Sequence, residues 1–82
     1  MMAMNPTLLA SFNQWITWAL DDLADLPSAE ASAVVRSLKI KHTRKTLTHA
    51  LERANQLRCR DRKAMCLRVL NWLNAEIRRL PA

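Results

Sequence analysis

The sequence predicts a small all-α fold, because its composition favours helices over sheets. The chain has 82 residues, is 50% hydrophobic, and contains no Gly, no Tyr and a single Phe. Tight hairpin turns need positive φ angles that Gly supplies, whereas Leu, Ala, Arg and Lys favour helix. The apolar content is also too high for a disordered tail. We therefore expect one domain, a three- or four-helix bundle without strands, over residues 1–82.

The first helix is expected over residues 6–25. Asn5 and Pro6 are typical of an N-cap and of the first helical position, and Pro27 disfavours helix at the residue before it. Between them, apolar residues recur at spacings of three and four, as in an amphipathic helix. This stripe consists of Leu8, Leu9, Phe12, Trp15, Ile16, Ala19, Leu20 and Leu23.

Two shorter helices are expected over residues 29–41 and 44–58. Ser28 can cap the first of them, whose apolar side would be Ala31, Val34, Val35 and Leu38. Residues 38–43 alternate in polarity, which favours an extended connector without forbidding helix, and Thr43 can cap the next helix. We expect a break there; without it the two helices would fuse into one rod. The second of them would bury Leu47, Ala50, Leu51, Ala54 and Leu57.

The last helix is expected over residues 62–80, with Asp61 as its N-cap and Pro81 after its end. The connections between the helices are short, as expected for antiparallel neighbours. The apolar stripe of this helix consists of Cys66, Val69, Leu70, Leu73, Ile77 and Leu80.

The charged residues are divided unevenly along the chain. Residues 1–35 hold four acids and no base, a net −4, whereas residues 36–82 hold thirteen bases and three acids, a net +10. A field of one sign concentrates oppositely charged partners, and nucleic-acid phosphates are the densest such charges. We expect a basic regulatory protein that binds nucleic acid through residues 36–63. The expected phosphate contacts are Lys41, Arg44, Lys45, Arg53, Arg58, Arg60 and Arg62; the expected base contacts are Thr48, His49 and Asn55.

A helix-turn-helix motif over residues 29–57 fits this segment poorly. Arg36 and His42 fall where core contacts are needed, and no Gly eases the turn. The basic residues themselves, rather than a motif, carry the prediction.

A protein-interaction module is the alternative hypothesis. Trp15 falls in the first stripe and is expected in the core, but Trp18 and Trp72 lie off the centres of their stripes. Exposed Trp side chains are common at interface hot spots. In this interpretation the chain is an adaptor, secretion co-chaperone or phage- or plasmid-type inhibitor that docks on an acidic partner surface, or it forms a homodimer.

The acids near the end of the first helix, Asp21, Asp22 and Asp25, face an unfavourable helix dipole. We expect Arg or Lys from the basic segment to contact them.

The remaining classes find little support in the sequence. No phosphate loop or nucleophile motif indicates an enzyme, a small-molecule substrate or a cofactor. His42, His49, Cys59 and Cys66 have the wrong spacing for zinc. The two cysteines are too far apart for a disulfide within one helix, so we expect free thiols in a reducing cytoplasm. No apolar run is long enough to span a membrane.

Overall fold

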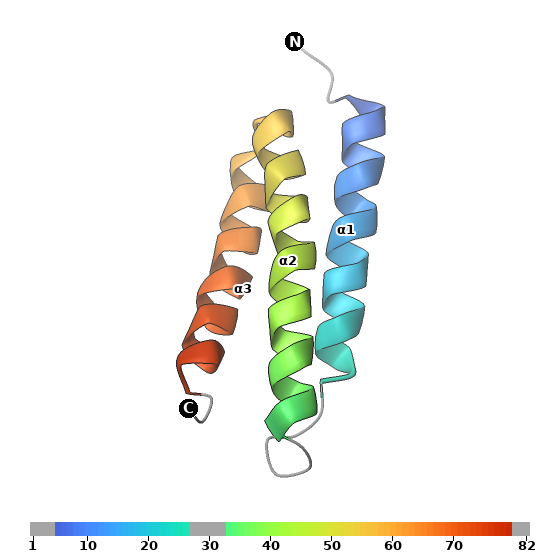
Figure 1. Cartoon of the computed structure of the whole chain (residues 1–82). Helices are drawn as coiled ribbons and strands as arrows, with labels where there is room; N and C mark the ends of the chain where they lie inside the picture. Colours follow the sequence, from blue (N-terminus) through green and yellow to red (C-terminus); the bar gives the residue numbers. More distant parts are fainter. Residues whose placement is uncertain (1–4, 27–32, 80–82) are drawn as a thin grey trace.

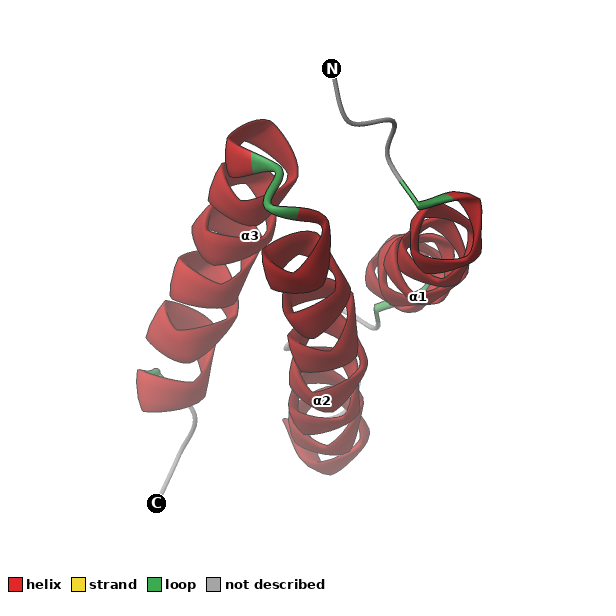
Figure 2. Ribbon diagram, turned by 90° about the horizontal axis from the view of Figure 1, so that it is seen from above, coloured by secondary structure: helices red, strands yellow, loops and turns green. Residues whose placement is uncertain are grey.

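The computed structural model describes residues 5–26 and 33–79, which form three helices packed together (Figure 1). These are α1 (Pro6–Ala24), α2 (Ala33–Leu57) and α3 (Arg60–Arg78). Helix α2 lies between the other two and runs antiparallel to both (Figures 1 and 2). The described residues contain no strand, so the all-α prediction is confirmed. Four residues with predicted roles lie outside the described residues: Pro27, Ser28, Leu80 and Pro81.

Helix α1 begins where the sequence predicts. The Asn5 side chain accepts hydrogen bonds from the backbone N–H groups of Thr7 and Leu8, at 2.9 and 3.2 Å, and Pro6 follows it. These contacts satisfy two of the N–H groups that a helix start leaves without partners.

Helix α2 is continuous, so the break expected between residues 41 and 44 is wrong. Thr43 is fully buried, and its hydroxyl donates to the carbonyl of Lys39 at 2.8 Å instead of capping a new helix. Thr46 and Thr48 bond in the same way to the carbonyls one turn before them. A Thr whose hydroxyl is satisfied inside the helix has no reason to end it. The uninterrupted helix also removes the turn that a helix-turn-helix motif needs.

The apolar side predicted for the start of this helix is wrong as well. Val34, Val35 and Leu38 are 71%, 44% and 63% exposed, whereas Ile40 is fully buried. The alternating pattern at residues 38–43 placed Ile40 in a connector, but in the continuous helix it shares a face with Thr43 and Leu47.

The turn between α2 and α3 is a Schellman motif with Arg58 in the left-handed conformation, at φ 55°. The N–H of Cys59 donates to the carbonyl of Ala54, and the N–H of Arg58 donates to that of Asn55. This position usually holds Gly, because a Cβ is disfavoured there. Cys59 becomes the residue before α3. Asp61, predicted as the cap, lies instead in the first turn of α3, where its negative charge interacts favourably with the positive end of the helix dipole.

The core runs along α2 and is contributed by all three helices. Its fully or nearly fully buried members are Phe12, Ile16, Ala19, Ile40, Leu47, Ala50, Ala54, Cys66 and Leu73. Leu20 belongs to the predicted stripe of α1 but is 49% exposed. Ala50 and Ala54 are fully buried on α2, where their small side chains leave room for the neighbouring helices. The residues of α2 and α3 that do not face this core are turned outward.

Candidate functional site

The structure divides the predicted phosphate-binding residues into outward and inward side chains. We define the cationic face as six outward residues that are all exposed. They are Lys41, Arg44 and Lys45 on α2, Arg58 at the turn, and Arg60 and Lys63 at the start of α3.

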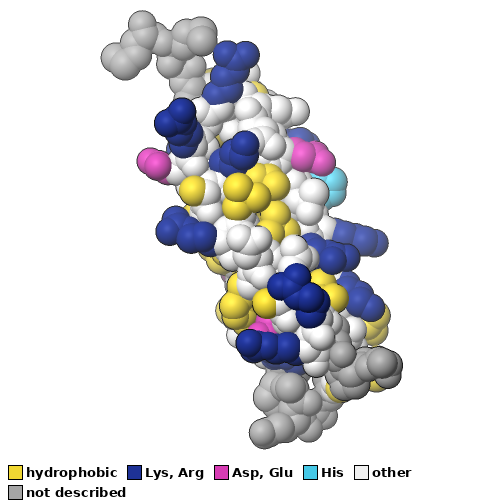
Figure 3. All heavy atoms as spheres, turned by 90° about the vertical axis from the view of Figure 1, so that its left-hand side faces the viewer, with side chains coloured by type: hydrophobic (Ala, Val, Ile, Leu, Met, Phe, Trp, Pro, Cys, Tyr) yellow, Lys and Arg dark blue, Asp and Glu magenta, His cyan; other side chains and the backbone are white. Residues whose placement is uncertain are grey.

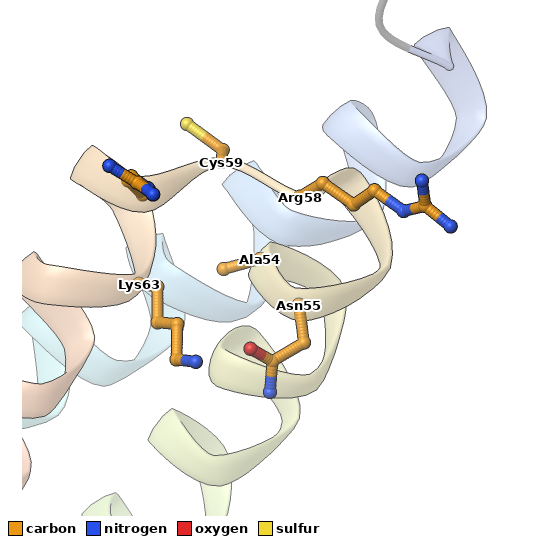
Figure 4. Close-up of a pocket in the computed structure, with 6 residues that line it drawn as sticks. Ala54, Asn55, Arg58, Cys59 and Lys63 are labelled. Atoms are coloured by element: carbon orange, nitrogen blue, oxygen red, sulfur yellow. The ribbon is translucent and has the colours of Figure 1, made fainter.

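One group of these cations surrounds the turn between α2 and α3. A hollow of about 190 Å³ is lined by Arg58, Arg60 and Lys63, together with Ala54, Asn55 and Cys59, and no acid from the described residues lines it. Asn55 and Lys63 point into the same space, whereas Arg58 extends away from them (Figure 4). Because Arg58 and Lys63 point in different directions, this group presents its charges over a broad area rather than to one small anion.

The second group lies farther along α2. Lys41, Arg44 and Lys45 are exposed on consecutive turns, and Arg44 Nη1 lies 3.5 Å from Oδ1 of Asn74 on α3. This contact places Arg44 on the side of α2 that borders α3, the same side as the hollow at Asn55.

The two groups are separated by neutral surface. Asn55 lines the hollow of the first group, and it is eleven residues, or about 16 Å, from Arg44 on the same helix. Thr48 and Asn55 are exposed on this side of α2, and Leu67 on α3 is 40% exposed. Figure 3 shows Lys and Arg side chains above and below a hydrophobic patch on the face that α3 presents. The sequence predicted one charged surface along residues 36–63, whereas the structure has two clusters of cations with a neutral strip between them.

Two predicted phosphate contacts, Arg53 and Arg62, turn inward and are not part of the cationic face. Arg53 Nε donates to Oγ of Ser11 on α1 at 3.0 Å. The guanidinium of Arg62 lies 5.7 Å from the centre of the Phe12 ring, also on α1. Both side chains are half-buried and hold α1 against the rest of the fold.

His49, predicted to contact bases, lies at the seam between α1 and α2. Its ring stacks on Trp15 with centroids 4.4 Å apart, and Trp18 packs edge-on against Trp15. At the same seam, His42 Nε2 lies 3.6 Å from Oδ2 of Asp22. The aspartates were expected to contact Lys or Arg, but the partner of Asp22 is a histidine.

The acid of α2 is also turned toward this seam. Glu52 lies 3.9 Å from Nδ1 of His49 and 3.7 Å from Nη1 of Arg53, both of which contact α1. Because these contacts draw its carboxylate toward α1, Glu52 offsets little of the charge of Lys41, Arg44 and Lys45.

The two tryptophans predicted at an interface are both exposed, Trp18 by 46% and Trp72 by 44%. Trp72, Leu23, Val69 and Arg68 line a second, open hollow of about 370 Å³ between α1 and α3. We call this the α1–α3 hollow. Trp15, which was expected in the core, is half-buried and packs against the core residues.

The cysteines are free and lie in different surroundings. The backbone N–H of Arg62 and then its side chain, whose Nη1 lies 3.2 Å from the sulfur, lower the pKa of the half-buried Cys59 thiol. Burial raises the pKa of the Cys66 thiol. Among residues 5–26 and 33–79, no three His, Cys, Asp or Glu side chains come together as metal ligands.

Lys63 is the member of the cationic face that was not among the predicted contacts. It lies one turn into α3, and it enters the hollow because α3 begins at Arg60 instead of Arg62. The sequence did not indicate where α2 ends, because the residue in the left-handed conformation is Arg58 and not the Gly that usually marks a helix end.

Comparisons of the chain with models of protein families, with curated proteins and with solved structures found no match. In the part of the chain that the structure describes, no helix combines the length and the hydrophobicity needed to cross a membrane. Function must therefore be inferred from the geometry of the side chains.

Proposed function

We propose that this protein is a small regulatory protein that binds duplex nucleic acid through the cationic face. The observation that supports this most is the separation of its two clusters: Arg44 lies about 16 Å along α2 from Asn55, which lines the hollow around which the other cluster gathers. The major groove of B-form DNA is about 12 Å wide between its two phosphate backbones. Each cluster would neutralise the phosphates of one backbone, so that α2 and α3 lie across the groove.

The strip between the clusters suits the floor of that groove. Asn55 has an exposed amide that can donate to and accept from base edges. The exposed hydroxyl of Thr48 donates to the carbonyl of Arg44 and can still accept a hydrogen bond from a base. Exposed Leu67 offers an apolar contact of the kind that a thymine methyl group accepts. The phosphate contacts supply affinity, and these three side chains supply what sequence preference there is.

The spacing also favours DNA over duplex RNA. The major groove of A-form RNA is deep and narrow, so two clusters about 16 Å apart would not reach both of its backbones in the same way. A free thiol at Cys59 and another at Cys66 suit a reducing cytoplasm, which we propose as the compartment.

The test is fluorescence anisotropy with a labelled DNA duplex of about 20 base pairs, in about 50 to 200 mM salt. The double substitution Arg44→Gln/Lys45→Gln removes two charges from the cationic face. The matched control, Arg68→Gln/Arg79→Gln, removes two charges that are not part of the cationic face, since Arg68 lines the hollow between α1 and α3 and Arg79 pairs with Glu76. Removing one phosphate contact should weaken binding roughly eightfold at about 0.1 M salt. We expect roughly 60-fold weaker binding for the first variant and less than about threefold for the second. Equal effects of the two variants, or no binding by the wild type at low salt, would refute the proposal.

The alternative proposal is a protein-interaction module that docks on an acidic partner, and the exposure of Trp18 and Trp72 favours it. Under this proposal the tryptophans anchor the complex and the cations only speed encounter. Trp18→Ala and Trp72→Ala would then leave DNA binding unchanged and abolish the biological activity, whereas Arg44→Gln would change only the rate of association.

A further inference from the structure

The side of the molecule formed by α1 and α3 is open and apolar at its centre. No Cα atom of α1 lies within 8 Å of one in α3 among the described residues, because both helices pack on α2 instead. Side chains bridge the gap at one end, where Arg62 lies over the Phe12 ring. Farther along, the α1–α3 hollow stays open, lined by Leu23, Val69 and Trp72.

Large apolar side chains on this side of the molecule are left uncovered. Trp72, which lines the hollow, is 44% exposed. Leu20 precedes Leu23 by three residues and so lies on the same side of α1, and it is 49% exposed. Leu20 is also the one member of the α1 stripe whose side chain is exposed rather than buried or half-buried. Exposed apolar residues around a concave surface are typical of sites where another helix packs.

We propose that a second copy of this chain covers the α1–α3 hollow. Helices α1 and α3 run in the same direction (Figure 1). A two-fold axis parallel to them would therefore place α1 of each copy over α3 of the other, at the same height along the helices. Leu20 of one copy then packs against Trp72 of the other, and the contact occurs twice because the interface is isologous.

Charge complementarity selects this occupant. The charged residues of α1 are acids, whereas Arg68 on α3 and Arg79 at its end lie on the same helix as Trp72. Asp21 is adjacent to Leu20, and Arg68 lines the hollow; both are exposed. In the two-fold arrangement Asp21 of one copy meets Arg68 of the other at the rim. An axis perpendicular to the helices would instead set α1 against α1 and α3 against α3, like charge against like.

The size of this surface sets the expected strength of the dimer. A face as long as the 19 residues of α1, about 28 Å, and one 18 Å molecular width across covers roughly 500 Å² per copy. The total of roughly 1,000 Å² is at the lower limit for a specific interface. We therefore expect a dissociation constant in the micromolar range rather than an obligate dimer.

The test is sedimentation equilibrium of the full chain, from about 1 μM to about 500 μM protein. The wild type should change from monomer to dimer within this range. Trp72→Ala should weaken association by at least about 100-fold, because each dimer loses two central contacts. Trp72 is exposed, so circular dichroism should show an unchanged helix content.

A charge exchange makes the orientation testable. Arg68→Glu should weaken the dimer about tenfold through two repulsive rim pairs, and Asp21→Arg/Arg68→Glu should restore it to within about threefold. Lys63→Glu, with the same change of charge on the cationic face, should leave association unchanged. A wild type that stays monomeric at the highest concentration, an equal effect of Lys63→Glu, or no restoration by the double variant would overturn the inference.

Discussion

Replacing Arg58 with Gly should stabilise the fold and at the same time weaken nucleic-acid binding. Arg58 holds a φ of 55°, and a left-handed residue with a Cβ costs about 1–2 kcal/mol. Gly removes that cost but adds about 0.5–1 kcal/mol of backbone entropy to the unfolded chain. The net gain is about 0.5–1 kcal/mol. For a chain of 82 residues, whose unfolding entropy is about 0.17 kcal/mol/K, Tm should rise by about 3–6 °C.

Two further variants separate the backbone effect from the charge. Arg58→Ala removes the guanidinium but keeps the Cβ, so its Tm should stay near that of the wild type, while DNA binding falls about eightfold at about 0.1 M salt, as for Arg58→Gly. Arg58→Lys keeps both the charge and the Cβ and should change neither property by much. Differential scanning calorimetry and anisotropy measure the two effects on the same samples. Equal Tm values for the Gly and Ala variants would refute the left-handed geometry at this turn.

The other predictions concern the continuity of α2, an ion pair and a thiol. Thr43→Pro should cost at least about 3 kcal/mol in urea unfolding, whereas Thr43→Val should cost less than about 1 kcal/mol; a tolerated Pro would contradict the continuous helix. Arg36 and Glu76 form a 3.2 Å ion pair with both side chains only 16% exposed. Arg36→Ala should therefore cost about 1–3 kcal/mol, and Arg36→Met/Glu76→Leu should recover most of it, which unfolding curves would show. The lowered pKa of Cys59 gives it more thiolate at neutral pH than an ordinary thiol has, so its alkylation should begin at lower pH; Arg62→Ala should shift that profile upward, and an unchanged profile would exclude the guanidinium as a cause.

The sequence was sufficient to predict the helical class and the start of α1, because those features follow from local chemistry. An Asn–Pro pair has few alternatives to a helix start, and the side chain of Asn5 makes the expected bonds. The stripe of α3 was predicted by spacing alone, and Cys66 and Leu73 from it are fully buried.

The continuity of α2 could not be predicted, because the hydroxyl of a Thr has two local uses. It can cap a new helix, or it can donate to the carbonyl one turn before it, as that of Thr43 does, and the sequence does not reveal which case applies. The same holds for the cations. Arg53 and Arg60 are both Arg residues of the basic segment, and the sequence does not distinguish their roles. The structure shows that Arg53 bonds to Ser11 on α1, whereas Arg60 is exposed.

The salt dependence of DNA binding tests the role of the cationic face most directly. Six contacted phosphates predict a slope of about −5.4 for log K against log salt. Neutralising one residue of each cluster, with Lys41→Gln/Lys63→Gln, should reduce this slope to about −3.6, while Arg53→Gln/Arg62→Gln should leave it at about −5.4. A slope near zero for the unaltered protein, or an equal reduction by the inward pair, would contradict a phosphate-binding role for these six residues.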